Sequence, residues 1–263
     1  MKLTFYGTRG SIPVSDKKFD IYGGETSCLR VCSSEEPMTE IYIDAGSGIT
    51  KASPFQRGDI HVLIGHLHLD HVIGLPFFKG LSEKERKINI YLPDKEKSEA
   101  ALKQLISPPY WPIGLLDYPA EVNIRSLEGK FDIASIHIQM IKIKHPGGST
   151  AFRLSENGHS FVYATDFEHD DNEIDKLTSF CKDADLLIYD GQYTKEEYSK
   201  HMGYGHSFPE IGLEIAKRAD VKKILFTHFD PTHDDSFLTE WEKQIQKENP
   251  SAGFAKKGMS VSL

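Results

Sequence analysis

Runs of hydrophobic residues predict two groups of strands with helices between them. In the first part of the chain the runs are Leu3–Tyr6, Cys28–Cys32, Ile41–Asp44, Val62–Ile64 and Ile88–Leu92. In the second part they are Ile133–Lys144, Ala151–Leu154, Phe161–Thr165, Leu186–Tyr189 and Ile224–Thr227. Most are short and rich in β-branched or aromatic residues, as strands are. Because helical patterns lie between them, the fold class expected is α/β.

One of these runs changes phase. Apolar residues alternate in Ile136–Met140, and the alternation continues one residue out of phase in Ile141–Lys144. An extra residue on one strand of an antiparallel pair produces such a shift. We therefore predict a half-buried antiparallel strand that contains a β-bulge.

Three segments have the pattern of helices. Asp234–Gln246 carries an apolar stripe of period 3.6, which should pack on a sheet. That stripe consists of Phe237, Leu238, Trp241 and Ile245. Ser207–Glu210 has the Ser-x-x-Glu spacing of a capping box with proline in the first turn, so a helix should begin there and run towards Ala219. A third helix is predicted over Asn172–Lys182.

Length and composition are those of an ordinary globular chain. The 263 residues are 39% hydrophobic and 27% charged, and we expect one domain over residues 1–263. No signal peptide is recognisable, and the apolar runs are far too short to span a bilayer, so a cytoplasmic location without a membrane partner is expected. The cysteines Cys28, Cys32 and Cys181 have no CxxC spacing, which predicts small buried hydrophobic residues.

The net charge of the chain limits which substrates it is expected to bind. A formal net charge of −8 repels a polyanion, and no dense Lys/Arg cluster would hold a phosphate backbone. A long nucleic acid is therefore not the expected substrate. A small anion held by metal ions is compatible with this charge, because a bound cation outweighs it locally.

Titratable groups are concentrated directly after an apolar run. His66-Leu67-His68-Leu69-Asp70-His71 follows Val62–Ile64. Imidazole and carboxylate groups suit Zn, Mn or Fe. Alternation along an extended segment would place His66, His68 and Asp70 on one side, with His71 turning at the start of a helix or loop. Four candidate ligands at this spacing favour a metal site over solvated loop histidines.

Further candidate ligands lie elsewhere in the chain. His145, Asp166 and His228 each follow a strand-like run. Functional sites are commonly built where strands end, so these three side chains could complete the cluster.

The order of these residues resembles that of the metallo-β-lactamase superfamily over nearly the whole chain. The resemblance implies an αββα sandwich, in which two mixed β-sheets flanked by helices carry a dinuclear site at their strand ends. It also implies two divalent ions per chain, with Zn expected first and Mn or Fe as alternatives. The implied ligands of the first ion are His66, His68 and His145. Those of the second ion are Asp70, His71 and His228, with Asp166 as a bridge.

Three more motifs resemble the phosphodiesterase branch, which contains ribonuclease Z and bacterial cyclic-phosphodiester hydrolases. They are Phe5–Ser11, Ile43–Gly48 and Ile188–Tyr193, the last followed by Gly205-His206-Ser207. In that branch an acidic residue and the histidine of a Gly-His-Ser motif act as a pair. This implies catalytic roles for Asp190 and His206, with Asp70 as a third catalytic residue.

Two departures separate the chain from ribonuclease Z. Those enzymes have glutamate at the position of Asp190, and their tRNA-gripping flexible arm has no recognisable counterpart here. The stretch Tyr22–Cys28 resembles a bacterial hydrolase signature, with Glu25 in place of its usual asparagine.

The expected function is hydrolysis of a small phosphodiester, with a cyclic nucleotide or related cyclic phosphate as the first choice, by attack of a metal-activated water. The subunit count is open, and a homodimer is compatible with the sequence. A di-iron oxygen or redox sensor is one alternative, although its typical glutamate is replaced here by His68. A thioesterase or lactonase of the same fold is another, although it has no need of the Asp190–His206 pair.

The remaining candidates receive ordinary structural roles. Asp44 should hold a glycine turn or orient a metal-binding histidine. Arg9 and Lys51 should be solvated, and Gly10 and Gly147-Gly148 should form tight turns with positive φ. Histidines without a motif, expected at the surface or in packing, are His61, His137, His159, His169, His201 and His233. The prolines of Ser107–Pro112 predict a loop. Candidates to stack on a base are Phe77, Phe78, Tyr110 and Trp111.

Overall fold

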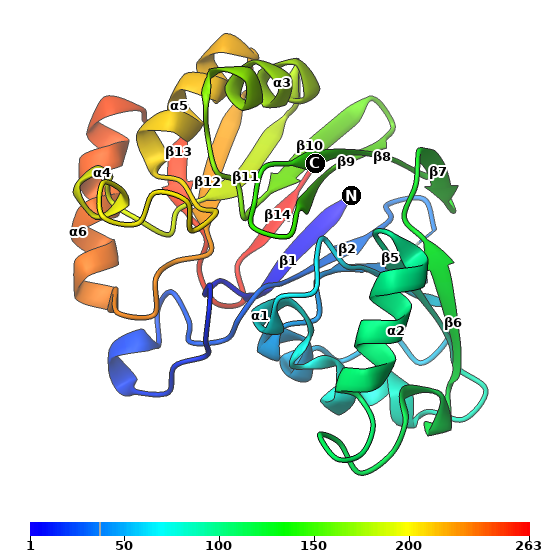
Figure 1. Cartoon of the computed structure of the whole chain (residues 1–263). Coiled ribbons are helices and arrows are strands. Elements are labelled where there is room, and N and C mark those ends of the chain that lie inside the picture. Colours follow the sequence, from blue (N-terminus) through cyan, green and yellow to red (C-terminus); the bar gives the residue numbers. More distant parts are fainter. Residues whose placement is uncertain (37) are drawn as a thin grey trace.

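Two β-sheets pack face to face in the computed structural model, which describes residues 1–36 and 38–263 (Figure 1). Within these residues the strand orders are β14-β1-β2-β3-β4-β5-β6 and β13-β12-β11-β10-β9-β8-β7. The first sheet contains β1 (Lys2–Gly7), β2 (Cys28–Cys32), β3 (Glu40–Ile43), β4 (Ile60–Leu63), β5 (Lys87–Leu92), β6 (Glu121–Ser126) and β14 (Ser260–Ser262). The second contains β7 (Lys130–Ile133), β8 (Ile136–Ile143), β9 (Ser149–Glu156), β10 (His159–Ala164), β11 (Leu186–Asp190), β12 (Lys223–Thr227) and β13 (Ala252–Phe254).

Helices cover the outer faces of both sheets. They are α1 (Leu69–Val72), α2 (Lys95–Leu105), α3 (Asp171–Cys181), α4 (Lys195–Tyr198), α5 (Pro209–Arg218) and α6 (Asp235–Glu248). In Figure 1, α2 lies beside β5 and β6, whereas α3, α5 and α6 lie beside the second sheet. The αββα sandwich implied by the resemblance is confirmed. None of the helices described for residues 1–36 and 38–263 has the length and apolar character needed to cross a membrane.

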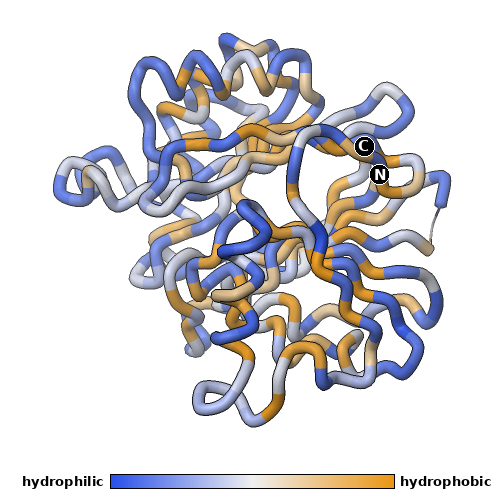
Figure 2. Tube along the Cα trace, turned by 45° about the vertical axis from the view of Figure 1, so that its right-hand side comes forward, coloured by the Kyte–Doolittle hydropathy of each residue, from blue (hydrophilic) through white to orange (hydrophobic). Residues whose placement is uncertain are grey.

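The hydrophobic core is divided into three layers by the two sheets. Side chains from both sheets, including Phe5, Leu63, Phe152 and Ile188, meet in the middle layer. One outer layer lies between the second sheet and its helices, and the other lies under α2. Figure 2 shows hydrophobic residues along the strands and hydrophilic residues in the peripheral loops and helix turns. Burial of apolar side chains on both faces explains why several strands read as continuous apolar runs.

Parallel strands place several chain segments at one edge of each sheet. β3, β4 and β5 run parallel in the first sheet, and β10, β11 and β12 run parallel in the second. The carboxyl ends of parallel strands lie along the same edge, where ligand sites of α/β proteins are commonly built. The polar residues that follow these strands are therefore collected from distant parts of the sequence.

The predicted run Ile133–Lys144 is corrected in two respects. It is not one strand, because β7 ends at Ile133 and a turn at residues 134–135 precedes β8. The antiparallel pairing of β8 with β9 is continuous from His137 to Ile143, so the predicted bulge is wrong. The phase of the apolar pattern changes because Ile136 and Ile138 face the middle layer, whereas Ile141 and Ile143 pack towards the helices.

The helix predictions are correct in position and partly wrong in detail. α5 begins at Pro209, but its N-cap is Phe208 without a side-chain cap bond, so the capping box predicted from Ser207 does not form. The Ser207 hydroxyl contacts Tyr189 instead. In α6 the predicted stripe packs inward except for Phe237, which is exposed. The three cysteines are buried and free, as predicted.

Candidate metal centre

The histidine-rich segment leaves the end of β4 and turns into α1. His66 and His68 lie in the connection, and Asp70 and His71 lie in the single turn of α1. Asp70 is therefore placed by a helix turn and not by the extended alternation predicted from the sequence. This turn directs Asp70 and His71 into the interior, where both are buried.

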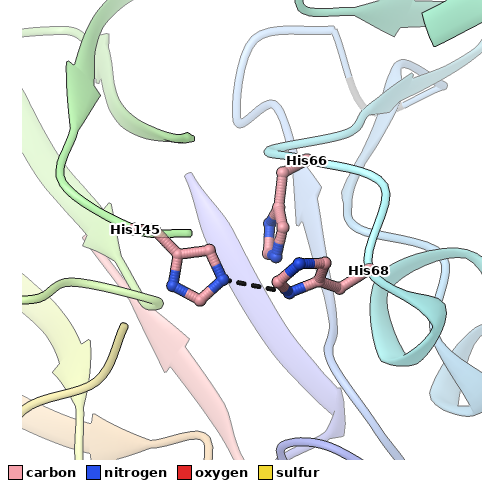
Figure 3. Close-up of side chains that lie close together, drawn as sticks. All are labelled: His66, His68 and His145. Atoms are coloured by element: carbon pink, nitrogen blue, oxygen red, sulfur yellow. Dashed lines mark hydrogen bonds between the residues drawn. The ribbon is translucent and has the colours of Figure 1, made fainter. Parts of the chain in front are cut away.

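Three histidines form the first group of possible ligands, and Figure 3 shows their rings turned towards one another. His66 and His68 follow β4 of the first sheet, and His145 follows β8 of the second sheet. Their ligand nitrogens all lie within 4.8 Å of one another. The closest pair is His145 Nε2 and His68 Nδ1, at 3.0 Å. The group therefore joins the two halves of the sandwich.

A second group is more acidic and lies deeper. Asp70, His71, Asp166 and His228 also have ligand atoms within 4.8 Å of one another, and all four are buried. The Oδ2 atom of Asp166 lies 3.3 Å from His71 Nε2 and 3.5 Å from His228 Nε2. The seven side chains that the resemblance implied as ligands are thus brought together by the fold.

Asp166 lies between the two groups. Its Oδ1 atom is 3.9 Å from Nε2 of both His66 and His145, whereas its Oδ2 atom faces His71 and His228. One carboxylate oxygen is therefore directed to each group. This is the arrangement required of a carboxylate shared by two cations.

Hydrogen bonds on the far side of three rings determine where their lone pairs point. The Nδ1–H group of His71 donates to Asp44 Oδ2 at 2.8 Å. That of His228 donates to Gln192 Oε1 at 3.1 Å, and that of His145 donates to the Gly205 carbonyl at 2.8 Å. When these rings are deprotonated, as metal binding requires, each Nε2 presents a lone pair to the cluster. The expected contact of Asp44 with a histidine of the cluster is confirmed.

This donor set fits divalent cations. His71 Nε2 and His228 Nε2 face each other at 3.2 Å beside the Asp70 carboxylate, so the two nitrogens require a proton or a cation between them. Among the described residues, both ring nitrogens of His66 and the Oδ2 atom of Asp166 are buried without a hydrogen-bond partner. Buried polar atoms are rarely left without partners, so these atoms point to ligands of another kind.

The electrostatic field of the cluster favours positive charge in the acidic group. Burial alone would lower the pKa of His228, but Asp166 and Asp70 raise it to about 9. Burial would raise the pKa of Asp166, but His228, His71 and His66 hold it well below its usual value. The carboxylates that favour a proton on a histidine favour a divalent cation in the same place.

Backbone conformation at the strand ends is unusual. Asp44, Asp166 and His228 have φ angles of 62°, 59° and 66°, in the left-handed region that L-residues seldom adopt. Each lies within two residues of the end of β3, β10 or β12. Such conformations cost about 1–2 kcal/mol each, and their clustering at one place is typical of functional sites.

Asp190 and His206 form the expected pair beside this cluster. Asp190 is fully buried, and its Oδ2 atom accepts from His206 Nδ1 at 3.1 Å and from the Asp166 backbone N–H at 2.9 Å. Its other oxygen accepts the backbone N–H groups of Ser207 and Gln192. A cavity of about 400 Å³ is lined by His68, Asp70, Asp166 and His206, together with Ser11, Leu67 and Leu69. His206 of the pair therefore shares one cavity with three of the metal-ligating candidates, His68, Asp70 and Asp166.

Two supporting residues were missed by sequence reasoning. Gln192 orients His228 and also donates to the Ser11 hydroxyl at 3.1 Å. Glu168 is buried, and its carboxylate accepts the Gly205 N–H at 2.6 Å and the Tyr198 hydroxyl at 2.6 Å. Through Gly205 it holds the loop that positions His145. Proximity to Asp190 and Asp166 in the sequence was the signal available for both residues.

Several expectations about neighbouring residues are corrected. Arg9 is fully buried and donates to the carbonyls of Gly23, Asp230 and His233. Gly10 has no positive φ, but a Cβ there would lie 2.6 Å from the His228 ring, so close approach explains the glycine.

Other expectations about single residues are partly met. Phe78 is buried in the core and does not face the cavity, so it cannot stack on a base. Lys51 is exposed, although it pairs with Glu25. Gly147 and Gly148 have the expected positive φ.

Residues 39–229 match the family model described as "Beta-lactamase superfamily domain". The chain belongs to the beta-lactamase superfamily. This match covers most of the chain and includes all seven ligand candidates.

Relatives of this beta-lactamase superfamily chain confirm the resemblance to the phosphodiesterase branch. A protein named ribonuclease Z from Archaeoglobus fulgidus is 23% identical over 93% of this chain and 92% of its own. The metallo-β-lactamase fold protein YhfI from Bacillus subtilis has a TM-score of 0.73 at 20% identity, covering 99% of each chain. A diphosphatase of the PhnP family has a TM-score of 0.72 at 18% identity, covering 100% of this chain and 97% of its own. The two solved structures share the fold.

The bridging position of Asp166 predicts that both metal positions depend on it. Asp166→Asn preserves the size of the side chain, and asparagine tolerates the left-handed backbone, but one of the two oxygens is lost. Neither position should retain an ion after dialysis, as measured by elemental analysis of the folded protein. Asp132→Asn, at an exposed carboxylate, is the control and should keep the wild-type metal content. Full occupancy in Asp166→Asn would show that Asp166 does not bridge.

The hydrogen bonds of Glu168 predict a separate effect on the three-histidine group. Glu168→Gln leaves one buried N–H of the Gly203–Gly205 loop facing an amide N–H₂ group, which loosens the carbonyl that orients His145. Loss of such an orienting contact typically weakens metal binding about 10–100-fold. Calorimetric metal titration should show this loss for one of the two binding steps and leave the other unchanged. Glu248→Gln, at an exposed glutamate, should bind as the wild type does, and equal affinities in both variants would contradict the role of Glu168.

Proposed function

We propose that this metal-dependent hydrolase is a dinuclear phosphodiesterase that acts on a small phosphodiester, with a cyclic nucleotide or a related cyclic phosphate as the preferred class. The observation that carries the proposal is the Asp190–His206 pair: His206 lines the same cavity as Asp70 and Asp166, and the buried Asp190 carboxylate holds its ring from behind. We further propose that residues 1–263 act as one hydrolase domain, because both sheets contribute to the middle core layer.

The proposed ligands fall into the two groups defined by the geometry. His66, His68 and His145 would hold one ion, and Asp70, His71 and His228 would hold the other, with Asp166 shared. Histidine and carboxylate ligands suit Zn, and also Mn or Fe. Two such ions supply a water of lowered pKa and neutralise charge on the phosphate oxygens.

The residues of the chain would perform the proton transfers. Asp190 accepts the Nδ1–H of His206 and thereby orients the ring, so the other ring nitrogen is available for a proton that can be donated to the leaving oxygen. Asp70 lines the cavity and can accept the proton of the attacking water. Both groups are held by backbone hydrogen bonds, Asp70 by the Ser11 N–H and Asp190 by the Ser207 N–H. Such pre-organisation lowers the cost of reaching the transition state.

The proposed class of substrate is supported by the net charge of the chain and by the names of similar proteins. The net charge of −8 opposes binding of a long polyanion, and the PhnP-family neighbour is named a diphosphatase. The relatives named ribonuclease Z make an RNA the second candidate, which qualifies the expectation that no long nucleic acid binds. A small phosphodiester remains our first choice because no lysine or arginine is among the described residues that line the cavity.

A direct test compares substrates of both classes. The protein, loaded separately with Zn, Mn and Fe, is assayed on 3′,5′- and 2′,3′-cyclic nucleotides, on bis(p-nitrophenyl) phosphate and on a precursor tRNA. We expect turnover of bis(p-nitrophenyl) phosphate and of one cyclic class, and loss of both in Asp166→Asn. Cleavage of the tRNA alone would replace the small-substrate proposal. No turnover on any substrate with both metal positions filled would remove the phosphodiesterase function.

The proposed proton donor predicts a dependence on the leaving group. A general acid contributes about 10²–10⁴-fold where the leaving oxygen is strongly basic. In His206→Ala, hydrolysis of the cyclic nucleotide should therefore fall by about 10²-fold or more, and that of bis(p-nitrophenyl) phosphate by less than about 10-fold. Both rates are measured at matched metal content, with the exposed His159→Ala as control. An equal loss on the two esters would remove the role of proton donor.

A further inference from the structure

An exposed row of apolar side chains begins at the cavity. Leu69 lines the cavity and is 56% exposed, and Ile73 and Phe77 are 42% and 61% exposed. α1 continues in helical conformation through Ile73 and Gly74, so Leu69 and Ile73 are neighbours at i and i+4. The Phe77 N–H donates to the Gly74 carbonyl, which begins the next turn. We call these three residues the apolar shelf.

The outer end of the apolar shelf is an aromatic pair that is fixed in place. The rings of Phe77 and Trp111 meet edge to face, with centroids 4.8 Å apart. Trp111 Nε1 donates to the Tyr118 hydroxyl at 2.7 Å, and this hydroxyl donates to the Pro76 carbonyl at 2.9 Å. The loop that carries Trp111 is therefore fastened to the turn that carries Phe77. An exposed ring held in this way can bind without further loss of side-chain freedom.

We propose that the apolar shelf binds the base of a nucleotide substrate, with the ring of Phe77 as the stacking partner. This proposal rests on the proposed function, because it requires the phosphate of the same ligand to lie in the cavity. Leu69 belongs to both the cavity and the shelf, so the two adjoin and one ligand can contact both. Aromatic rings stack on every base through its π face, and sequence-independent recognition of this kind is common.

The dimensions of the shelf favour a small planar group over a protein. Three side chains present far less area than the roughly 800 Å² per partner of a specific protein interface. A nucleobase is a planar group of a size that the Phe77 ring and the adjoining side chains of the shelf can cover. Apart from Leu67 and Leu69, the side chains that line the cavity are polar.

The test compares two ligands that differ only in the base. Adenosine 5′-monophosphate and ribose 5-phosphate are titrated calorimetrically into the metal-loaded full chain. Stacking on one ring is worth about 1–3 kcal/mol, which corresponds to a preference for the nucleotide of at least about 5-fold. Phe77→Ala should reduce this preference to near unity, and Phe77→Tyr should retain it. Phe237→Ala, at an exposed aromatic residue of α6, should behave as the wild type does.

The outcomes separate this proposal from the proposed function. Equal binding of the two ligands by the wild type, no binding of either, or an unchanged preference in Phe77→Ala would overturn the apolar shelf as a base site. None of these results bears on turnover of bis(p-nitrophenyl) phosphate, which tests the hydrolase separately. Conversely, a base preference that is lost in Phe77→Ala would stand even if the cyclic nucleotides were not hydrolysed.

Discussion

The shared position of the Asp166 carboxylate is the constraint on which the rest of the site depends. Its two oxygens face different groups of histidines, and these groups come from both sheets. A fully buried carboxylate is unfavourable unless positive charge or donors surround it. The histidines supply that surrounding either as protonated rings or as ligands of a shared cation, because hydrogen bonds elsewhere turn their Nε2 atoms inward. The geometry of one side chain therefore links the packing of the two sheets to the chemistry of the cavity.

The groups behind the ligands show how this geometry is maintained. Asp44 follows β3, Gln192 follows β11, and Glu168 acts from the segment after β10. Each accepts hydrogen bonds from a histidine of the cluster or from the loop beside it. Because these acceptors lie on segments fixed by neighbouring strands, ring orientation follows from sheet packing. The same logic explains Gly10, which leaves room for the His228 ring.

Sequence reasoning recovered the features that depend on local pattern. The strand-like runs, the positions of α3, α5 and α6 and the ligand candidates could be predicted because periodicity and strand ends are local signals. The misses depend on contacts between distant segments. The phase change in β8 reflects helices covering one half of the strand, and Arg9 is buried by carbonyls more than 200 residues away in the sequence. Neither Glu168 nor Gln192 has a role until the Gly203–Gly205 loop and His228 are placed beside them.

The candidate site lowers the stability of the metal-free folded chain, and metal binding would offset part of this loss. Asp44, Asp166 and His228 each adopt a left-handed backbone, and buried imidazole and carboxylate groups are crowded together, with the Nε2 atoms of His71 and His228 3.2 Å apart. These features oppose folding of the metal-free chain, whereas bound cations would relieve the electrostatic part of the cost. The scaffold must therefore be stabilised elsewhere, and the three apolar layers do this without contributing to the chemistry. Separation of a stable core from a strained edge allows the polar cluster to remain assembled, so that cations meet ligands already in place.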